Sequence, residues 1–167
     1  NAFVAGCLLL PGCAVGALMT PLSGQMLDRF GAKAPILMGS CAILLSTVCF
    51  GVFTLHLSAL LLWIVYIFFA FGQGCSVGTN MTNGLRSLDP ALNADGNAVI
   101  NTTQQLGGAV GTSIVSSIVA AAQAQPGVEL AQSTAQGTHY AFLVLLIMAV
   151  AMLCCSAGAL RLKRKAH

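Results

Sequence analysis

Charged residues are what this 167-residue sequence has least of: it contains seven Lys or Arg and four Asp or Glu, and 7% of its residues are charged. A soluble domain carries about a quarter charged residues. With 57% hydrophobic residues and a mean hydropathy of +0.87, the chain has too few polar groups to cover a surface exposed to water. The composition therefore excludes an ordinary soluble domain and favours a protein whose solvent is lipid.

Several signals of other protein classes are also missing. The chain enters an apolar run directly after Asn1, without a basic stretch before the run or a small-residue cleavage site after it, so the run is not typical of a signal peptide. We expect the sequence to be a piece of a longer one. The seven cysteines form no C-x-x-C pair and have no His at metal-ligand spacing, which predicts packing rather than a metal site. No Ser/His/Asp arrangement or phosphate loop is present, so we predict a protein that is not an enzyme, has no cofactor and binds no nucleic acid.

Five apolar runs are long enough to cross a bilayer, which takes about 20 residues in a helix. They are predicted at 2–22, 35–55, 58–80, 97–122 and 140–160, with "HLS" at 56–58 as a tight turn between the second and the third. The predicted fold class is therefore all-α, a polytopic membrane helix bundle. Residues 1–160 would form the helical domain, and residues 161–167 would form a basic cytoplasmic tail.

The basic residues fall on one side of this topology. Alternating spans place 23–34, 81–96 and the tail on one face of the membrane, and 56–57 and 123–139 on the other. The first face holds every basic residue of the chain: Arg29, Lys33, Arg86, Arg161, Lys163, Arg164 and Lys165. The second face holds Glu129 and no basic residue. The positive-inside rule then predicts a multi-pass protein of the cell membrane whose N-terminal end lies outside and whose C-terminus is cytoplasmic.

The segment "SGQMLDRFGAKAP" between the first two spans has a specific order of residues. Gly24 can let two helices approach closely, and Gly31 suits a reversal with positive φ. Asp28 can meet a helix N-terminus or a basic side chain, while Arg29 and Lys33 can reach carboxylates or lipid headgroups. Such contacts stabilise one arrangement of helices and must break before another forms. We therefore predict a gating role at the cytoplasmic end; a solvated turn without such a role is the alternative.

These residues resemble a known motif. The pattern G-x-L-a-D-R-x-G-R-K-x-x-L is the cytoplasmic loop signature of the major facilitator superfamily, and this chain reads G-Q-M-L-D-R-F-G-A-K-A-P-I. The matching residues are Gly24, Asp28, Arg29, Gly31 and Lys33, with Met26 and Ile36 as conservative changes and Ala32 where a basic residue is usual. The resemblance implies that residues 24–36, here called the signature segment, form a cytoplasmic gating loop.

A second stretch, "LNADGNAVINTTQQLGGAVGTSI", is similar to the penultimate helix of the fourteen-span drug:proton antiporters of that superfamily. The residues that carry this similarity are Asn101, Gln105, Leu106, Gly107, Gly108 and Gly111. Each six-helix half of such a transporter carries the signature loop between its second and third helices, and four spans follow it, as they do here. The resemblance implies the carboxyl-terminal half of a transporter without the first helix of that half, whose partner is the missing N-terminal half.

The fourth predicted span has a polar face. On a helical wheel at 100° per residue, five residues fall within about 40° of one line, with Gln105 beside them. We call these five the amide stripe: Asn97, Asn101, Gln104, Gly108 and Gly111. Amides that face lipid would remain unsatisfied, so the stripe is predicted to face protein or water. Lining of a pathway by Asn97, Asn101, Gln104 and Gln105 and packing between helices both remain open.

Glycines at close-packing spacing occur in the first, third and fourth spans, the spans that the resemblance would place centrally. The pairs are Gly12 with Gly16, Gly74 with Gly78, and Gly107 with Gly111, and Gly108 is added from the fourth span. The second and fifth spans contain no amide side chain, and the resemblance implies that they lie at the periphery, facing lipid.

The function predicted from these features is part of a secondary active transporter, in which alternating access exports drugs or other lipophilic or cationic compounds in exchange for protons. No Asp, Glu, Lys, Arg or His lies in the middle of a span, so a proton-carrying carboxylate would lie outside this sequence. The expected partners are the lipid bilayer, a small-molecule substrate and protons. A carrier of sugars or metabolites from the same superfamily, or a membrane assembly subunit that transports nothing, is the alternative.

Overall fold

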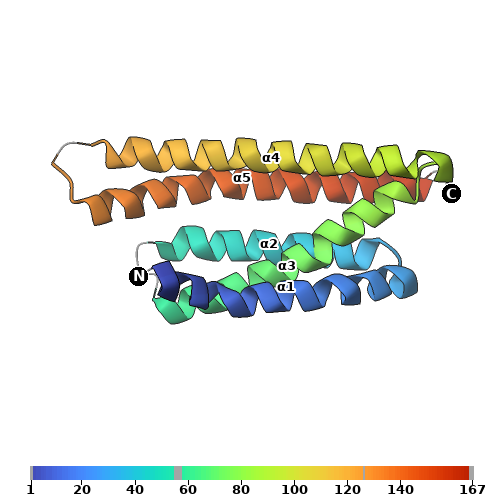
Figure 1. Ribbon diagram of the computed structural model, residues 1–167, viewed down its shortest axis with the longest axis horizontal. Helices are drawn as coiled ribbons and strands as arrows, with labels where there is room; N and C mark the ends of the chain where they lie inside the picture. The colour runs from blue at the N-terminus through green and yellow to red at the C-terminus, as the bar shows by residue number, and fades with distance from the viewer. Residues whose placement is uncertain (1, 55–57, 126, 166–167) are drawn as a thin grey trace.

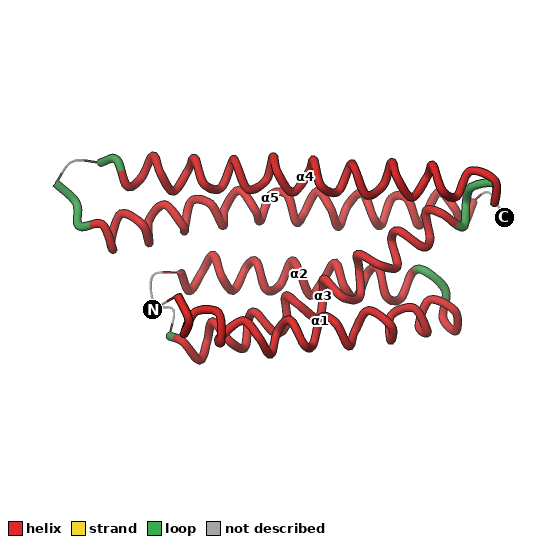
Figure 2. The backbone as a smooth tube through the Cα atoms, viewed as in Figure 1, coloured by secondary structure: helices red, strands yellow, loops and turns green. Residues whose placement is uncertain are grey.

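The computed structural model describes residues 2–54, 58–125 and 127–165, without the side chains of 2–5, 8, 59 and 161–165. The regular elements of this part of the chain are all helices: α1 Ala2–Phe30, α2 Lys33–Phe53, α3 Ala59–Leu85, the short 3₁₀ helix η2 Pro90–Leu92, α4 Asn93–Gln123 and α5 Leu130–Lys165 (Figures 1 and 2). The predicted all-α fold class is confirmed. Of the predicted turn at 56–58, residues 56 and 57 lie outside the described residues, and Ser58 caps α3 by accepting a hydrogen bond from the Leu61 N–H at 3.2 Å.

Helices in the described part are long and apolar enough to cross a membrane. Four of them meet this criterion by length and hydropathy, over Lys33–Phe53, Leu60–Leu85, Pro90–Gln123 and Leu130–Leu160. α1, whose first side chains are not described, has 29 residues and covers the remaining predicted span. The chain is thus a multi-pass membrane helix bundle.

Helices pack both with their neighbours in the chain and with helices further along it. α3 packs against both α1 and α2, α2 packs against α5, and α5 packs against α4. In Figure 1, α4 and α5 run antiparallel as one layer, and α3 crosses obliquely from the group of α1 and α2 toward the start of α4. α3 is therefore the central helix of the first group.

Glycines allow this close packing. A Cβ atom on Gly74 of α3 would lie 2.5 Å from the Gly16 carbonyl oxygen of α1, and the Ser23 hydroxyl of α1 donates a hydrogen bond to the Gly74 carbonyl at 3.1 Å. α2 and α3 meet in the same way, because a Cβ on Gly39 would lie 2.8 Å from the Gly72 carbonyl oxygen. Lipid tails are as apolar as leucine side chains, so such van der Waals and hydrogen-bond contacts hold membrane helices together.

α5 begins well before the predicted membrane span. It starts at Leu130 rather than near residue 140, so residues 130–139, predicted as part of a loop, are helical, and that prediction is wrong. The Thr134 hydroxyl donates to the Leu130 carbonyl at 2.6 Å and accepts a hydrogen bond from the Gln123 amide of α4 at 2.8 Å. With 36 residues, α5 is about 54 Å long, more than the roughly 30 Å of a hydrocarbon core. Hydropathy identifies only the part of a helix that lies in lipid. A helix can continue beyond that part where its polar side chains form hydrogen bonds, as Thr134 does.

Replacing Gly74 with Ala in the full-length protein should destabilise it. The new methyl group would press on the backbone carbonyl of Gly16, and overpacking of this kind costs about 1–3 kcal/mol. Gly24→Ala is the matched control, because no atom lies within 4 Å of the position of its Cβ, and we expect it to stay within about 1 kcal/mol of the unaltered protein. The measurement is the thermal unfolding temperature in detergent; equal temperatures for the two variants would contradict the close contact of α1 and α3.

Candidate functional site

The signature segment is mostly helical, with a reversal of two residues. α1 continues to Phe30, Gly31 has a φ of +76°, and α2 begins at Lys33. The Gly31 N–H donates to the Leu27 carbonyl at 3.1 Å, which closes the last turn of α1. Leu27 and Ile36 are buried on either side of this reversal. The segment therefore joins α1 rigidly to α2, and Asp28 and Arg29 lie on the last turn of α1.

Asp28 forms an ion pair with a residue that the sequence did not single out for this role. The Arg86 guanidinium, at the C-terminal cap of α3, donates to the Asp28 carboxylate at 2.6 Å. It is the only ion pair in the described part of the chain, and the two side chains are 52% and 65% exposed. Arg29 and Lys33 are exposed near it. Both arginines lie at the C-terminal end of a helix, where the helix dipole favours a positive charge.

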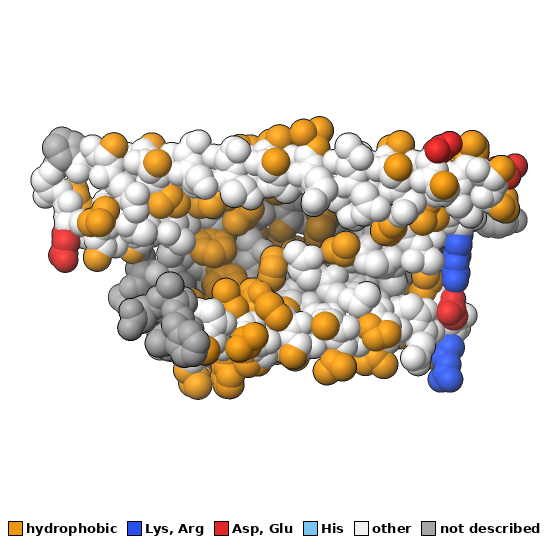
Figure 3. All heavy atoms as spheres, viewed as in Figure 1, with side chains coloured by type: hydrophobic (Ala, Val, Ile, Leu, Met, Phe, Trp, Pro, Cys, Tyr) orange, Lys and Arg blue, Asp and Glu red, His pale blue; other side chains and the backbone are white. Residues whose placement is uncertain are grey.

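The described basic side chains gather at one end of the bundle, here called the basic end. Arg29, Lys33 and Arg86 lie where α1 ends, α2 begins and α3 ends. Figure 3 shows Lys and Arg side chains at this end alone on the face in view, with acidic side chains beside them. Glu129 lies at the opposite end, between α4 and α5. The described Lys and Arg side chains are thus concentrated at one end of the long axis of the bundle.

The amide stripe of α4 faces open space. Every residue from 101 to 110 is exposed, and no atom lies within 4 Å of a Cβ placed on Gly107, Gly108 or Gly111. α4 is held nearer its two ends, by Gly84 and Leu85 of α3 at one end and by Gly137 of α5 at the other. Figure 3 shows the hollow that this leaves between α4 and α1.

Two amides of the stripe bind one another. The Asn101 side-chain amide donates to the backbone carbonyl and the side-chain oxygen of Asn97, at 3.0 Å each. Gln104 and Gln105 have no hydrogen-bonding partner among the described residues. The structure therefore leaves these two amides available to groups outside it.

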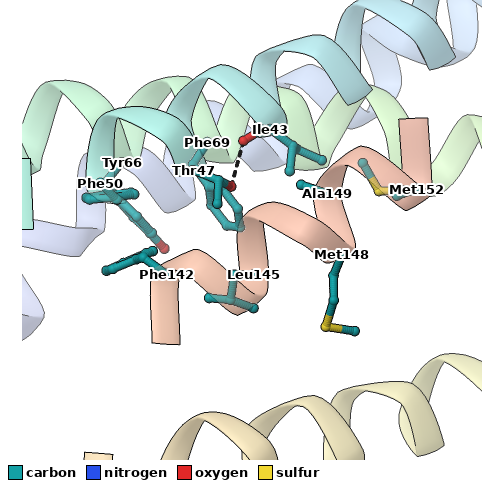
Figure 4. Close-up of a pocket in the computed structure, with 10 residues that line it drawn as sticks. All are labelled: Ile43, Thr47, Phe50, Tyr66, Phe69, Phe142, Leu145, Met148, Ala149 and Met152. Atoms are coloured by element: carbon teal, nitrogen blue, oxygen red, sulfur yellow. Dashed lines mark hydrogen bonds between the residues drawn. The ribbon is translucent and has the colours of Figure 1, made fainter. Parts of the chain in front are cut away.

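An apolar cavity of about 540 Å³ lies between α2, α3 and α5. Figure 4 shows Phe50 of α2 facing Phe142 of α5, with ring centroids 5.2 Å apart. The Thr47 hydroxyl at its wall donates to the Ile43 carbonyl at 2.8 Å, so its proton is not available to a ligand. The described residues include no group of three His, Cys, Asp or Glu that could hold a metal ion.

Sequence reasoning missed three features of this region. Arg86 was recognised as a cation but not as the partner of Asp28. Gly39 and Gly72 form a tight contact on a span that was predicted to be peripheral. Gln73 is an exposed amide in the middle of α3, and its signal, an amide within an apolar span, was present in the sequence.

A helix bundle of this kind, with spans joined by short turns and charge gathered at one end, defines a multi-pass membrane protein. Residues 1–112 match the family model of the Major Facilitator Superfamily, and the chain belongs to that superfamily. Its members are membrane transporters.

Curated relatives align with most of the chain. It is 33% identical to the lincomycin resistance protein LmrB of Listeria monocytogenes over 163 residues, which are 93% of this chain and 35% of the relative. The LmrB protein of Bacillus subtilis is 32% identical, over 90% of this chain and 33% of its own length. The multidrug resistance protein Stp of Mycobacterium tuberculosis is 28% identical, over 71% of this chain and 22% of its own length. The chain thus spans about a third of the LmrB proteins. No solved structure matches it significantly.

Asp28→Asn in the full-length protein should loosen the basic end. The variant keeps the shape of the side chain but removes its charge, and an exposed ion pair contributes about 0.2–1 kcal/mol. We expect a broader distribution of distances between spin labels at Phe30 of α1 and Leu88 beyond α3, measured by pulsed electron paramagnetic resonance. Asp95→Asn, the same change at the same end on α4, is the control and should leave the distribution unchanged.

The charge-swapped double variant Asp28→Arg with Arg86→Asp decides whether pairing is the cause. It restores attraction between the same two positions, so the distribution should narrow again. A distribution that stays broad would show that the ion pair does not hold these ends together.

Proposed function

We propose that this chain is part of a secondary active transporter that exports drugs or other lipophilic or cationic compounds in exchange for protons, by alternating access. The observation that carries the proposal is the alignment of at least 90% of the chain with relatives named for lincomycin resistance. The activity belongs to the whole transporter, of which this chain is about a third, because alternating access needs two bodies that move about one site.

In this proposal the signature segment regulates access at the basic end. Gly31, with its positive φ, shapes the end of α1, while Gly24 has open space at its Cβ position. Asp28, Arg29 and Lys33 carry the charges. The pair of Asp28 with Arg86 is exposed, so its exchange for water or another partner costs little free energy. A contact of this strength suits a protein that must populate two arrangements separated by a few kcal/mol.

Asn97, Asn101, Gln104 and Gln105 would line the pathway. Their exposed amides lie in a helix that crosses the membrane, where contact with lipid would leave them unsatisfied. They need water, a substrate or another helix of the same transporter opposite them. The open glycines of α4 leave room for a close approach of such a helix.

The hollow beside α4 supports a place for a helix outside this chain. Halves of this superfamily consist of two inverted three-helix repeats. α3, the first helix of the second repeat, packs between α1 and α2. By the same symmetry, the first helix of the first repeat would pack against α4 and α5, where Figure 3 shows the hollow. The N-terminal half would then face the bundle across the amide stripe.

We assign the basic end to the cytoplasm of a cell-membrane protein. Arg29, Lys33 and Arg86 lie there, and α5, whose last residues are rich in Lys and Arg, also ends there at Lys165. The positive-inside rule supports this orientation.

Transport by the reconstituted full-length protein tests the proposal. Proteoliposomes with an imposed pH gradient should accumulate lincomycin or ethidium, and a protonophore should abolish the accumulation. Vesicles that contain the Asp28→Asn variant are the matched comparison and should transport more slowly. Uptake of sugars alone would favour a metabolite carrier, and no uptake of any compound would favour an assembly subunit.

Gln104→Leu should reduce transport at least about tenfold if the amide lines the pathway, because a hydrogen bond to a substrate or to pathway water is lost in a site without bulk water. Thr103→Val is the matched control: Thr103 is also exposed on α4, but its hydroxyl donates to the Val99 carbonyl of its own helix at 2.8 Å. The initial rate of lincomycin uptake is the measurement. Equal rates in the two variants would place the amide stripe outside the pathway.

A further inference from the structure

A smaller cavity, of about 240 Å³, lies in a groove between α2 and α3, toward the end of the bundle opposite the basic end. The groove exists because two small side chains of α2, Ser46 and Cys49, lie opposite Val65 of α3. Ser46 and Val65 are buried and form its floor. Larger, exposed side chains form its rim: Leu45 of α2 and Ile64 and Phe68 of α3. We call this cavity the α2–α3 groove.

The lining of the groove is apolar in character. Its one hydroxyl, that of Ser46, donates to the Ala42 carbonyl of its own helix at 2.8 Å. The Cys49 thiol lies in a membrane-crossing helix, where free Cys behaves as a small hydrophobe. No charged or amide side chain is among the described residues that line the groove. An occupant of this groove must therefore be apolar along its whole length.

The groove lies within one half of the membrane. Its walls belong to two segments that are long and apolar enough to cross a bilayer, Lys33–Phe53 and Leu60–Leu85. From the cap residue Ser58 to Phe68, the deepest lining residue of α3, the helix rises about 15 Å. This is half of the roughly 30 Å of a hydrocarbon core, so the groove opens in the leaflet opposite the basic end.

The groove is turned away from the helices that pack on α2 and α3. On a helical wheel, its lining residues on α3 lie opposite Tyr66 and Ala70, which lie against glycines of α1. On α2 they lie roughly 120° from Phe50, which stacks on Phe142 of α5. In the described part of the chain, α2 and α3 alone line the groove. The neighbour on this side is therefore lipid.

We propose that the α2–α3 groove binds one acyl chain of a membrane phospholipid, in the leaflet opposite the basic end. A methylene group occupies about as much space as a water molecule, about 30 Å³, so the groove holds roughly eight methylenes. A transmembrane helix, about 10 Å across, would rest on the rim and leave the floor empty. An empty floor would lose van der Waals contacts, which a flexible chain restores. The proposal requires only that the chain crosses a membrane and does not depend on the proposed export function.

Quenching of tryptophan fluorescence by a brominated phospholipid tests the groove. The reporter is Phe68→Trp in the full-length protein, with every other tryptophan replaced by Phe. The protein is purified in glyco-diosgenin, whose rigid fused-ring tail does not fit a narrow groove, and dibromostearoyl-phosphatidylcholine is added stepwise. The reporter should be half-quenched at a lipid concentration about tenfold below that of a control on an open lipid-facing surface, because the chain buries more methylenes in the groove.

Ile147→Trp on α5 is the matched control. Ile147 is 70% exposed and lines neither the groove nor the apolar cavity. It lies at the depth of Leu45, because Phe142 stacks on Phe50 and each residue is equally far along its helix from that pair. Equal half-quenching concentrations for the two reporters would mean ordinary contact with lipid. A Phe68→Trp signal that lipid does not quench would mean that another helix covers the groove. Either result overturns the proposal.

Filling the groove shows whether the preference for lipid comes from it. Cys49→Phe adds a ring from the α2 side, and Leu61→Phe adds one from the α3 side if the first variant does not fold. In the Phe68→Trp protein, either change should raise the half-quenching concentration about tenfold, to that of the control. A preference that survives both changes would place the lipid outside the groove.

Thermal unfolding in the same detergent gives an independent measure. Palmitoyl-oleoyl-phosphatidylcholine should raise the unfolding temperature of the unaltered protein as its concentration rises, because the groove exists only in the folded state. Cys49→Phe should lose most of this increase, and Ile147→Phe should keep it. Equal increases in the two variants would contradict a binding site in the groove.

Discussion

The close approach of α1 and α3 is the contact on which the other features depend. The Gly16 carbonyl of α1 lies where Gly74 of α3 has no side chain, and Ser23 adds a hydrogen bond to Gly74. Asp28 follows Gly16 along α1 by as many residues as Arg86 follows Gly74 along α3, and the two helices run in the same direction. The register set by two glycines therefore brings Asp28 and Arg86 together at the basic end.

Polar residues in these helices fall into two groups with different meanings. Most hydroxyl side chains donate to a carbonyl of their own helix, as Thr47 does to Ile43 and Ser46 to Ala42, so they are satisfied wherever they face. Ser40 is an exception, because its buried hydroxyl has no partner in the described part of the chain. Amide side chains have more donors and acceptors than their own helix satisfies. Gln73 and Gln104 are left without partners in the described structure, and amides are thus the informative polar residues of this bundle.

Hydropathy predicted the helices because transfer into lipid depends on each residue by itself, and the all-α bundle is confirmed. It did not predict where α5 begins, since the helix from Leu130 continues outside the apolar stretch through hydrogen bonds of Thr134. Contacts between helices were less predictable still. Asp28 and Arg86 are 58 residues apart, and their meeting depends on the packing order of the helices. Nothing in the sequence distinguishes Gly39 and Gly72 from the other glycines, because their close contact depends on how α2 packs against α3.

The position of the ion pair limits how the proposed gating mechanism can work. Asp28 and Arg86 belong to two helices whose backbones are in contact at Gly16 and Gly74, so the pair can hold or release only the ends of α1 and α3. Separation of α1 from α3 would break this glycine packing, whereas exchange of one exposed partner for another costs little. Arg29 and Lys33, which form no ion pair in the described part of the chain, are then the cations available to carboxylates of the opposite half. Arg86 is paired with Asp28 and is therefore not available to those carboxylates. In this mechanism, access changes through an exchange of charge partners at the basic end, while α1 and α3 stay packed together at Gly16 and Gly74.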